Sequence, residues 1–229
     1  MNYRTQETPD AVILSPPVPA VGTVIWLHGL GADGNDFVPI VAELNLSQST
    51  PLRFVFPHAA VRPVTINNGY RMRAWYDIKA MALSAAEDAV GIRESERVVG
   101  DYIQREIDAG LAANAILIAG FSQGGAIALQ TGLRYPQRLG GILALSTYLP
   151  LRDTLATERS QANHDVPVLM CHGTRDAIVP LQLGAMSRDQ LLGHGYAVQW
   201  REYPMEHQVC MQEIEDIADW LRARAAASG

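Results

Sequence analysis

At 229 residues the chain is long enough for one sizeable hydrophobic core, and we expect a single domain over residues 1–229. Its content of 48% hydrophobic and 18% charged residues is typical of globular proteins, while a formal net charge of −6 argues against nucleic acid or an anionic membrane as partner. No apolar run reaches the roughly 18 residues of a membrane span, and the N-terminal ten residues lack the apolar core of a signal peptide. We therefore expect a cytoplasmic protein without stable membrane insertion.

Apolar runs in the first part of the chain predict buried strands. They lie at residues 11–14, 23–27 and 52–57, and the prolines that follow the first run are typical of an edge strand. Residues 37–46 fit a short helix.

A glycine-rich loop, residues 28–37, follows the second of these runs. Such a loop can turn several backbone N–H groups toward one point, which an oxyanion hole requires. We assign one oxyanion donor to the N–H of Leu30, and we expect His28 to orient the loop. A strand-to-helix turn or a phosphate cradle is the alternative. A phosphate cradle of the P-loop kind is disfavoured, because no Gly-Lys-Ser/Thr follows the loop.

The segment 60–83 has no regular pattern and is rich in aromatic residues and methionine. A connection of this length in a compact domain is often functional. Two interpretations stay open, a wall of an apolar substrate groove or ordinary loop packing. The side chains concerned are Tyr70, Met72, Trp75, Tyr76 and Met81.

A long helix is expected from about residue 87 to 109, and Gly110 ends it. Ser84 and Glu87 have the spacing of a capping box at its start. The charged side chains of this helix are interpreted as a solvated face.

A near-continuous apolar run, residues 115–119, predicts a strand buried on both faces, and a helical pattern begins a few residues later. Between them stands the Gly-x-Ser-x-Gly motif with Gly120, Ser122 and Gly124. A strand that turns back at once into a helix exposes the serine and crowds the positions two before and two after it. Ser122 is thus the candidate nucleophile, and the N–H of Gln123 is the second candidate oxyanion donor.

The remaining pattern alternates strands and helices. Strands are predicted at 140–146, 166–173 and 197–203, and helices at about 181–192 and 209–226. Alternation of this kind indicates a mostly parallel central sheet with helices on both faces. The polar stretch between the first two of these strands, residues 147–165, is too short for a large cap domain.

The acid and the base are expected beyond the carboxyl ends of the last two strands, where chemistry collects in parallel sheets. Asp176 follows one strand and His207 follows the other, in the order Ser, Asp, His of an α/β-hydrolase. In this arrangement the histidine takes the serine proton and the aspartate holds the imidazole. His172 also ends a strand, and we expect it to support the loop. Rival acids are Asp153, Asp165 and Glu206, none of which follows a strand as Asp176 does.

Neither a metal nor a cofactor is expected, because the sequence shows no His, Cys and carboxylate cluster at metal-ligand spacing. The two cysteines, Cys171 and Cys210, are interpreted as small hydrophobic residues rather than a redox pair.

Together these motifs resemble the phospholipase/carboxylesterase family, which includes bacterial carboxylesterases and acyl-protein thioesterases. The resemblance covers nearly the whole chain in order. It rests on residues 28–37 (HGLGADGNDF), 74–77 (AWYD), 120–125 (GFSQGG), 172–176 (HGTRD) and 179–180 (VP).

The resemblance implies an α/β-hydrolase fold without a large cap and carries Ser122, Asp176 and His207 over as the triad, with Leu30 and Gln123 as oxyanion donors. Family analogy suggests a homodimer. One departure is that Glu206 stands where many relatives have glycine, which leaves the conformation of the base loop open.

We therefore expect a serine carboxylesterase that hydrolyses short- to medium-chain esters through an acyl-enzyme. The alternative is thioesterase activity toward acyl-proteins or other thioesters, or lysophospholipase activity, with the same triad. A non-catalytic binding module is a third hypothesis, and it requires a broken triad, which this sequence does not have. Trp75, Tyr148 and Leu149 are the hypothesis for the acyl groove.

Overall fold

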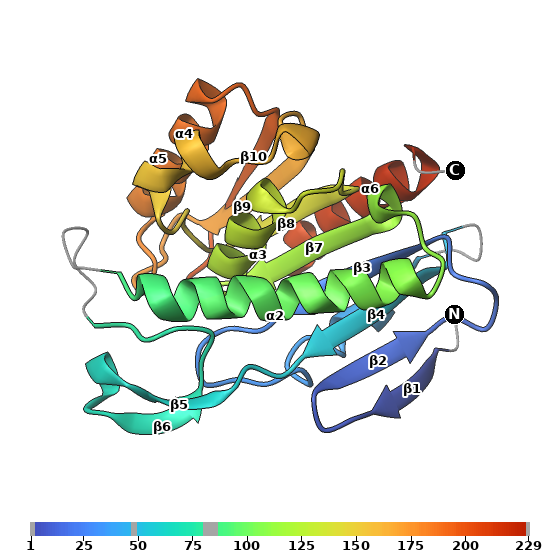
Figure 1. Ribbon diagram of the computed structural model, residues 1–229, viewed down its shortest axis with the longest axis horizontal. Coiled ribbons are helices and arrows are strands. Elements are labelled where there is room, and N and C mark those ends of the chain that lie inside the picture. Colours follow the sequence, from blue (N-terminus) through green and yellow to red (C-terminus); the bar gives the residue numbers. More distant parts are fainter. Residues whose placement is uncertain (1–2, 47–49, 80–86, 228–229) are drawn as a thin grey trace.

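The computed structural model describes residues 3–46, 50–79 and 87–227. Its centre is an eight-stranded sheet whose inner and C-terminal strands are parallel (Figure 1). Only the two strands at one edge are antiparallel to their neighbours. In spatial order the strands are β1 (Arg4–Glu7), β2 (Ala11–Ser15), β4 (Leu52–Pro57), β3 (Gly22–Leu27), β7 (Ile116–Phe121), β8 (Gly141–Leu145), β9 (Val168–Gly173) and β10 (Val198–Tyr203).

Helices cover both faces of this sheet, as predicted. One hydrophobic cluster packs α2 (Ala89–Asp108), α3 (Gln123–Arg134) and α5 (Leu181–Gly193) on one face. A second cluster packs α1 (Ile40–Glu43) and α6 (Met211–Ala227) on the other. The short helix α4 (Leu155–Glu158) and the 3-10 turns η1 (Thr65–Asn67), η2 (Ala113–Ala115), η3 (Arg152–Thr154) and η4 (Gln161–Asn163) complete the described elements.

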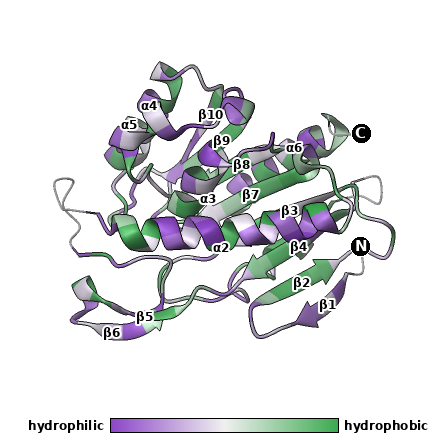
Figure 2. Cartoon of the chain, viewed as in Figure 1, coloured by the Kyte–Doolittle hydropathy of each residue, from purple (hydrophilic) through white to green (hydrophobic). Residues whose placement is uncertain are grey.

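The central strands are buried on both sides, which explains their continuous apolar sequences. Every residue of β3 and β8 is buried, and Figure 2 shows β3 and β7 as predominantly hydrophobic. By contrast, β1 is exposed along its whole length and is hydrophilic in Figure 2. It pairs with β2 through its backbone alone, so the sequence carried no hydrophobic signal for it.

Other differences from the predicted elements are local. The segment 60–83 contains an antiparallel hairpin, β5 (Val61–Val64) and β6 (Tyr70–Arg73), which was not predicted. The helix expected at 37–46 is limited to α1. The capping box was the wrong start for α2, because Asp88 is the N-cap and its side chain accepts from the N–H of Gly91. Ser84 and Met81 lie outside the described residues.

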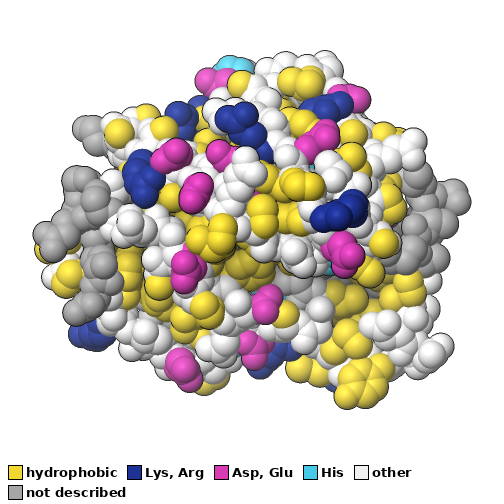
Figure 3. Space-filling view, turned by 180° about the vertical axis from the view of Figure 1, so that it is seen from behind, with side chains coloured by type: hydrophobic (Ala, Val, Ile, Leu, Met, Phe, Trp, Pro, Cys, Tyr) yellow, Lys and Arg dark blue, Asp and Glu magenta, His cyan; other side chains and the backbone are white. Residues whose placement is uncertain are grey.

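The back of the molecule mixes apolar and charged side chains. Figure 3 shows apolar groups across the middle of this face, with acidic and basic side chains scattered among them. None of the helices in the described ranges is both long and apolar enough to cross a membrane.

One carboxyl group in the first turn of α6 is buried. Glu213 has no exposed surface, and burial raises its pKa from 4.5 to about 8. In the unfolded chain the same carboxyl ionises near its ordinary pKa. Between these two values the folded state therefore keeps a proton that the unfolded state has lost, so its contribution to stability falls as the pH rises.

We predict that the protein loses up to about 5 kcal/mol of unfolding free energy through this group between pH 4.5 and pH 8. Glu213→Gln removes the ionisation and keeps the shape. Urea unfolding of both proteins across this range should show a steeper decline for the wild type. Parallel declines for the two proteins would contradict the assignment.

Candidate active site

Ser122 occupies the sharp turn between β7 and α3. Its backbone has φ 54° and ψ −119°, a region that L residues rarely adopt. The N–H of Ser122 donates to Leu145 and its carbonyl accepts from Ala126, so the turn is held on both sides. This conformation presents the serine at the carboxyl edge of the sheet and at the N-terminus of α3.

The two motif glycines make this turn sterically feasible. A Cβ on Gly120 would lie 2.3 Å from the carbonyl oxygen of Gly124. A Cβ on Gly124 would lie 2.3 Å from the carbonyl oxygen of Leu27 and 2.5 Å from that of His28. The first turn of α3 thus packs directly on the ends of β7 and β3, and the crowding predicted at both glycines is present.

Asp176 is buried in the loop after β9, and both of its carboxylate oxygens accept hydrogen bonds. Oδ1 accepts from the backbone N–H groups of Ile178 and Val179 at 2.9 and 2.8 Å. Oδ2 lies 2.7 Å from Nδ1 of His207, which follows β10. The predicted acid and base are therefore in direct contact, and the rival carboxylates Asp153 and Glu206 do not take this place.

The acid and base loops are tied to each other through their backbones. The N–H of Thr174 donates to Tyr203 at 2.8 Å, and that of Arg175 donates to Met205 at 3.0 Å. Glu206 does not have a positive φ and its side chain is exposed, so this position does not require glycine. Glu206 in place of the glycine of many relatives therefore leaves these backbone hydrogen bonds beside His207 intact.

His172 supports the acid loop from below. It is buried, its Nε2 donates to the carbonyl of Val179 at 2.8 Å, and the same nitrogen lies 3.7 Å from Oδ2 of Asp176. Burial lowers the pKa of His172, so the ring is neutral at neutral pH. The predicted role in loop support agrees with these contacts.

His28 organises the glycine-rich loop after β3. Its Nε2 accepts from the N–H of Ala59 at 3.0 Å, which places the proton on Nδ1, and Nδ1 donates to the carbonyl of Gly29 at 2.7 Å. Burial lowers the pKa of His28 to about 4. The ring is thus a neutral connector between two backbone segments, as the sequence suggested, and it does not line the cavity described below.

The side chain of Gln123 connects the start of α3 to the AWYD segment. Its Oε1 accepts from the N–H of Trp75 and its Nε2 donates to the carbonyl of Tyr76, both at 2.8 Å. Within the described residues, the backbone N–H groups of Leu30 and Gln123 have no hydrogen-bond acceptor. Both residues line the same cavity as Ser122, as an oxyanion hole requires.

The expectation that Trp75 lines the acyl groove is wrong. Trp75 is 2% exposed, and its Nε1 donates to the carbonyl of His28 at 2.9 Å. Its indole also lies against the His28 ring, with 5.3 Å between the ring centroids. Trp75 therefore fixes the loop that carries Leu30, and its aromatic ring serves packing rather than substrate contact.

Ser122 and His207 open into a cavity of about 880 Å³. Tyr148 and Leu149 line it as predicted, together with Leu183 and Met186 of α5. The volume and the apolar lining suit an acyl chain. The histidines His58, His164 and His194 and the acid Asp165 do not line it, whereas the rival acid Asp153 does.

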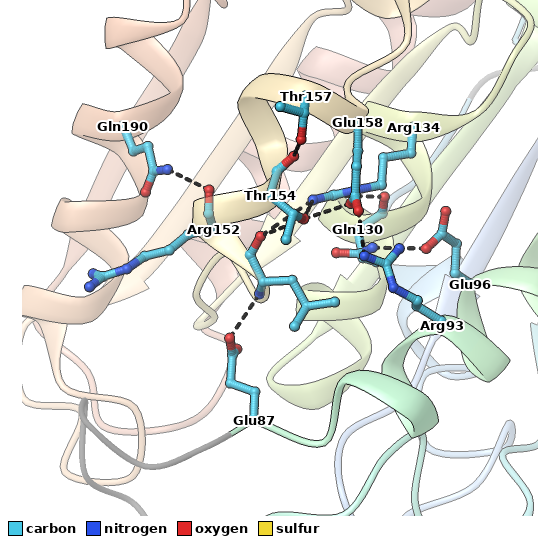
Figure 4. Close-up of polar contacts among 11 residues, drawn as sticks. Glu87, Arg93, Glu96, Gln130, Arg134, Arg152, Thr154, Thr157, Glu158 and Gln190 are labelled. Atoms are coloured by element: carbon cyan, nitrogen blue, oxygen red, sulfur yellow. Dashed lines mark hydrogen bonds and ion pairs between the residues drawn. The ribbon is translucent and has the colours of Figure 1, made fainter.

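The segment 148–158, which contributes residues 148, 149 and 151–154 to the wall of the cavity, is held by charged side chains (Figure 4). Glu158 accepts from Arg134 at 2.9 Å and from Thr154 at 2.6 Å, and it also pairs with Arg93. Burial raises the pKa of Glu158, but these three hydrogen bonds outweigh burial and hold the pKa at about 2. The backbone of Leu151 donates to Glu87 at 3.0 Å.

This wall was not predicted from the sequence. The helix charges, Arg93 among them, were interpreted as solvated, although Arg93 reaches across from α2 to Glu158. Ser187 of α5 was also missed, and its hydroxyl accepts from the N–H of Leu149 at 2.8 Å. Each contact joins residues far apart in sequence, so no local pattern indicates it.

Comparison with known proteins identifies the family of this chain. The family model described as phospholipase/carboxylesterase matches residues 8–225. The chain belongs to the phospholipase/carboxylesterase family of serine hydrolases. It is 40% identical over 220 residues to acyl-protein thioesterase 1 of Yarrowia lipolytica, covering 90% of this chain and 97% of the relative. It is 42% identical to the Neurospora crassa protein of the same name, with 90% of each covered.

Solved structures of other proteins have a similar fold. Arabidopsis thaliana SOBER1 gives a TM-score of 0.85 at 30% identity and covers 89% of this chain and 98% of its own. Zea mays acyl-protein thioesterase 2 gives 0.84 at 28% identity and covers 94% and 98%. The predicted α/β-hydrolase fold is confirmed.

We predict that Arg134→Met destabilises this family member through the cavity wall. Arg134 is 4% exposed, and its loss leaves Glu158 with one cation fewer in a partly buried position. Thermal unfolding should show a Tm lower by about 4–8 °C, which corresponds to roughly 2 kcal/mol. Arg152→Met is the control, because that guanidinium pairs at 3.7 Å with the exposed Asp153. Equal shifts in both variants would contradict this role for Arg134.

Proposed function

We propose that the protein is an acyl thioesterase and carboxylesterase that works through an acyl-enzyme on Ser122, with acylated proteins as the main substrates. The observation that carries this proposal is the 2.7 Å contact of Asp176 with His207 at the cavity that also holds Ser122. Relatives at 40–42% identity are named acyl-protein thioesterase, which favours thioesters over the plain oxygen esters first expected from the sequence.

In the proposed reaction the Ser122 hydroxyl attacks the substrate carbonyl while His207 takes its proton. Asp176 keeps the Nδ1 proton of His207 in place and stabilises the imidazolium that forms. The N–H groups of Leu30 and Gln123 bind the oxygen that gains charge. His207 then gives the proton to the leaving thiol or alcohol. In the second half of the cycle it activates a water molecule that releases the acyl group.

Carboxylesterase activity on small oxygen esters is the second candidate. The family description phospholipase/carboxylesterase supports it, and the apolar cavity is compatible with it, because the same acyl chain fits whatever atom leaves. Matched oxygen esters and thioesters of one acyl chain distinguish the two candidates. A thioester kcat/KM well above the ester value supports the thioesterase, and the reverse supports the carboxylesterase.

The test of the nucleophile is fluorophosphonate labelling followed by intact-mass analysis. We expect one adduct on the wild type and none on Ser122→Ala. The variant should lose about 10⁴- to 10⁶-fold in kcat, as other triads do. An equal adduct on both proteins would place the reactive group elsewhere and overturn the proposal.

Trp75→Phe tests the role assigned to the loop after β3. The variant loses the hydrogen bond to the carbonyl of His28 but keeps an aromatic ring. We predict that kcat falls about tenfold to the same extent for acetyl and octanoyl esters, because the oxyanion donors are affected and the acyl groove is not. A loss of kcat confined to the octanoyl ester would contradict this role and indicate that Trp75 contacts the acyl chain.

A further inference from the structure

Two tyrosine hydroxyls meet in the cavity wall. The hydroxyls of Tyr76 and Tyr148 are 2.7 Å apart, and both residues line the cavity that contains Ser122. Tyr76 is 2% exposed, whereas Tyr148 is partly exposed. Burial raises the pKa of both phenols, so each keeps its proton at neutral pH.

The two hydroxyls carry two protons, but only one of these protons is in a hydrogen bond. Two O–H groups share a single hydrogen bond, and no other acceptor for either hydroxyl is found among the described residues. Tyr76 is the more deeply buried, so a spare proton there would point into packed atoms. With Tyr76 as donor to Tyr148, the remaining O–H belongs to Tyr148 and faces the cavity. A donor at the cavity surface is free to bind an acceptor that enters the cavity, either water or a polar atom of a bound substrate.

The position of this O–H is fixed relative to the nucleophile. Thr147, next to Tyr148, donates from its hydroxyl to the carbonyl of Ser122 at 2.6 Å. On the other side, the carbonyl of Tyr76 accepts from Gln123, the residue after the serine. Hydrogen bonds of Tyr76 and of Thr147, the neighbour of Tyr148, thus hold both tyrosines beside the turn that carries Ser122. A ligand oxygen bound here has a defined position with respect to the acyl carbon.

We propose that Tyr148 donates its O–H to an acceptor oxygen of the substrate other than the scissile carbonyl, and that Tyr76 positions this donor. This inference rests on the proposed function and narrows its substrate class. The preferred substrates are thioesters or esters that carry a second oxygen, either a ketone or hydroxyl on the acyl chain or an amide carbonyl in the leaving group. Because the Tyr148 oxygen accepts from Tyr76, its own proton is a stronger donor.

Two matched substrate pairs separate these sources. The acyl pair is p-nitrophenyl octanoate and the same ester with a ketone at successive chain positions. The leaving-group pair is the octanoyl thioester of N-acetylcysteamine and that of pentanethiol, which has the same length without the amide. The wild type should prefer the oxygen-bearing member of at least one pair by about tenfold in kcat/KM, the contribution of one hydrogen bond.

Tyr148→Phe should abolish this preference, and Tyr76→Phe should reduce it in part, because the donor stays but is no longer positioned. Tyr135→Phe is the matched control, since its hydroxyl bonds to Gln104 on the surface, and it should keep the full preference. A loss limited to the ketone pair assigns the oxygen to the acyl chain, and a loss limited to the amide pair assigns it to the leaving group.

Equal rates within both pairs for the wild type, or an undiminished preference in Tyr148→Phe, would overturn the proposal and leave water as the partner of this O–H. Fluorophosphonate labelling of every variant keeps this failure separate from a failure of the Ser122 mechanism. If Tyr148→Phe does not fold, a full preference in Tyr76→Phe overturns the proposal and a reduced one supports it.

Discussion

The close packing of the first turn of α3 on the ends of β3 and β7 is the constraint on which the active site depends. A Cβ on Gly124 would clash with the backbone carbonyls of Leu27 and His28, and a Cβ on Gly120 would clash with the backbone of Gly124. Side chains at these two positions would push the helix away from the sheet. Because the helix starts there, Ser122 is forced into its strained conformation and comes to lie beside the loop that carries Leu30.

Neutral polar side chains then fix the loops around this turn. His28 and Gln123 each bridge two backbone groups, and His172 donates to the carbonyl of Val179 in the acid loop; all three side chains are buried. Burial lowers the pKa of both histidines, so these bridges do not change charge near neutral pH. A charged ring at His172 would place a buried positive charge 3.7 Å from Asp176, and a charged ring at His28 would place one beside the oxyanion loop.

The sequence predicted those parts of the molecule that follow from local patterns. Continuous apolar runs indicated the buried parallel strands, and strand ends indicated Ser122, Asp176 and His207, which the structure brings to one edge. The exposed strand β1 lacked such a pattern because it pairs through backbone alone. Trp75 was misassigned because an aromatic residue in an irregular segment has the same composition whether it faces a substrate or, as here, anchors a loop.

Backbone contacts hold one part of the site and side-chain ion pairs hold the other, so the two parts differ in how many substitutions they tolerate. The loops of the proposed triad and oxyanion donors are joined by backbone hydrogen bonds and close glycine contacts, which few substitutions preserve. The wall that carries Tyr148 is joined to the helices by side-chain ion pairs around Glu158 (Figure 4). Side chains in this wall can change the shape and polarity of the cavity without moving the backbone around Ser122. Differences in substrate preference among members of this family are therefore expected to arise in the wall, while the reaction chemistry stays the same.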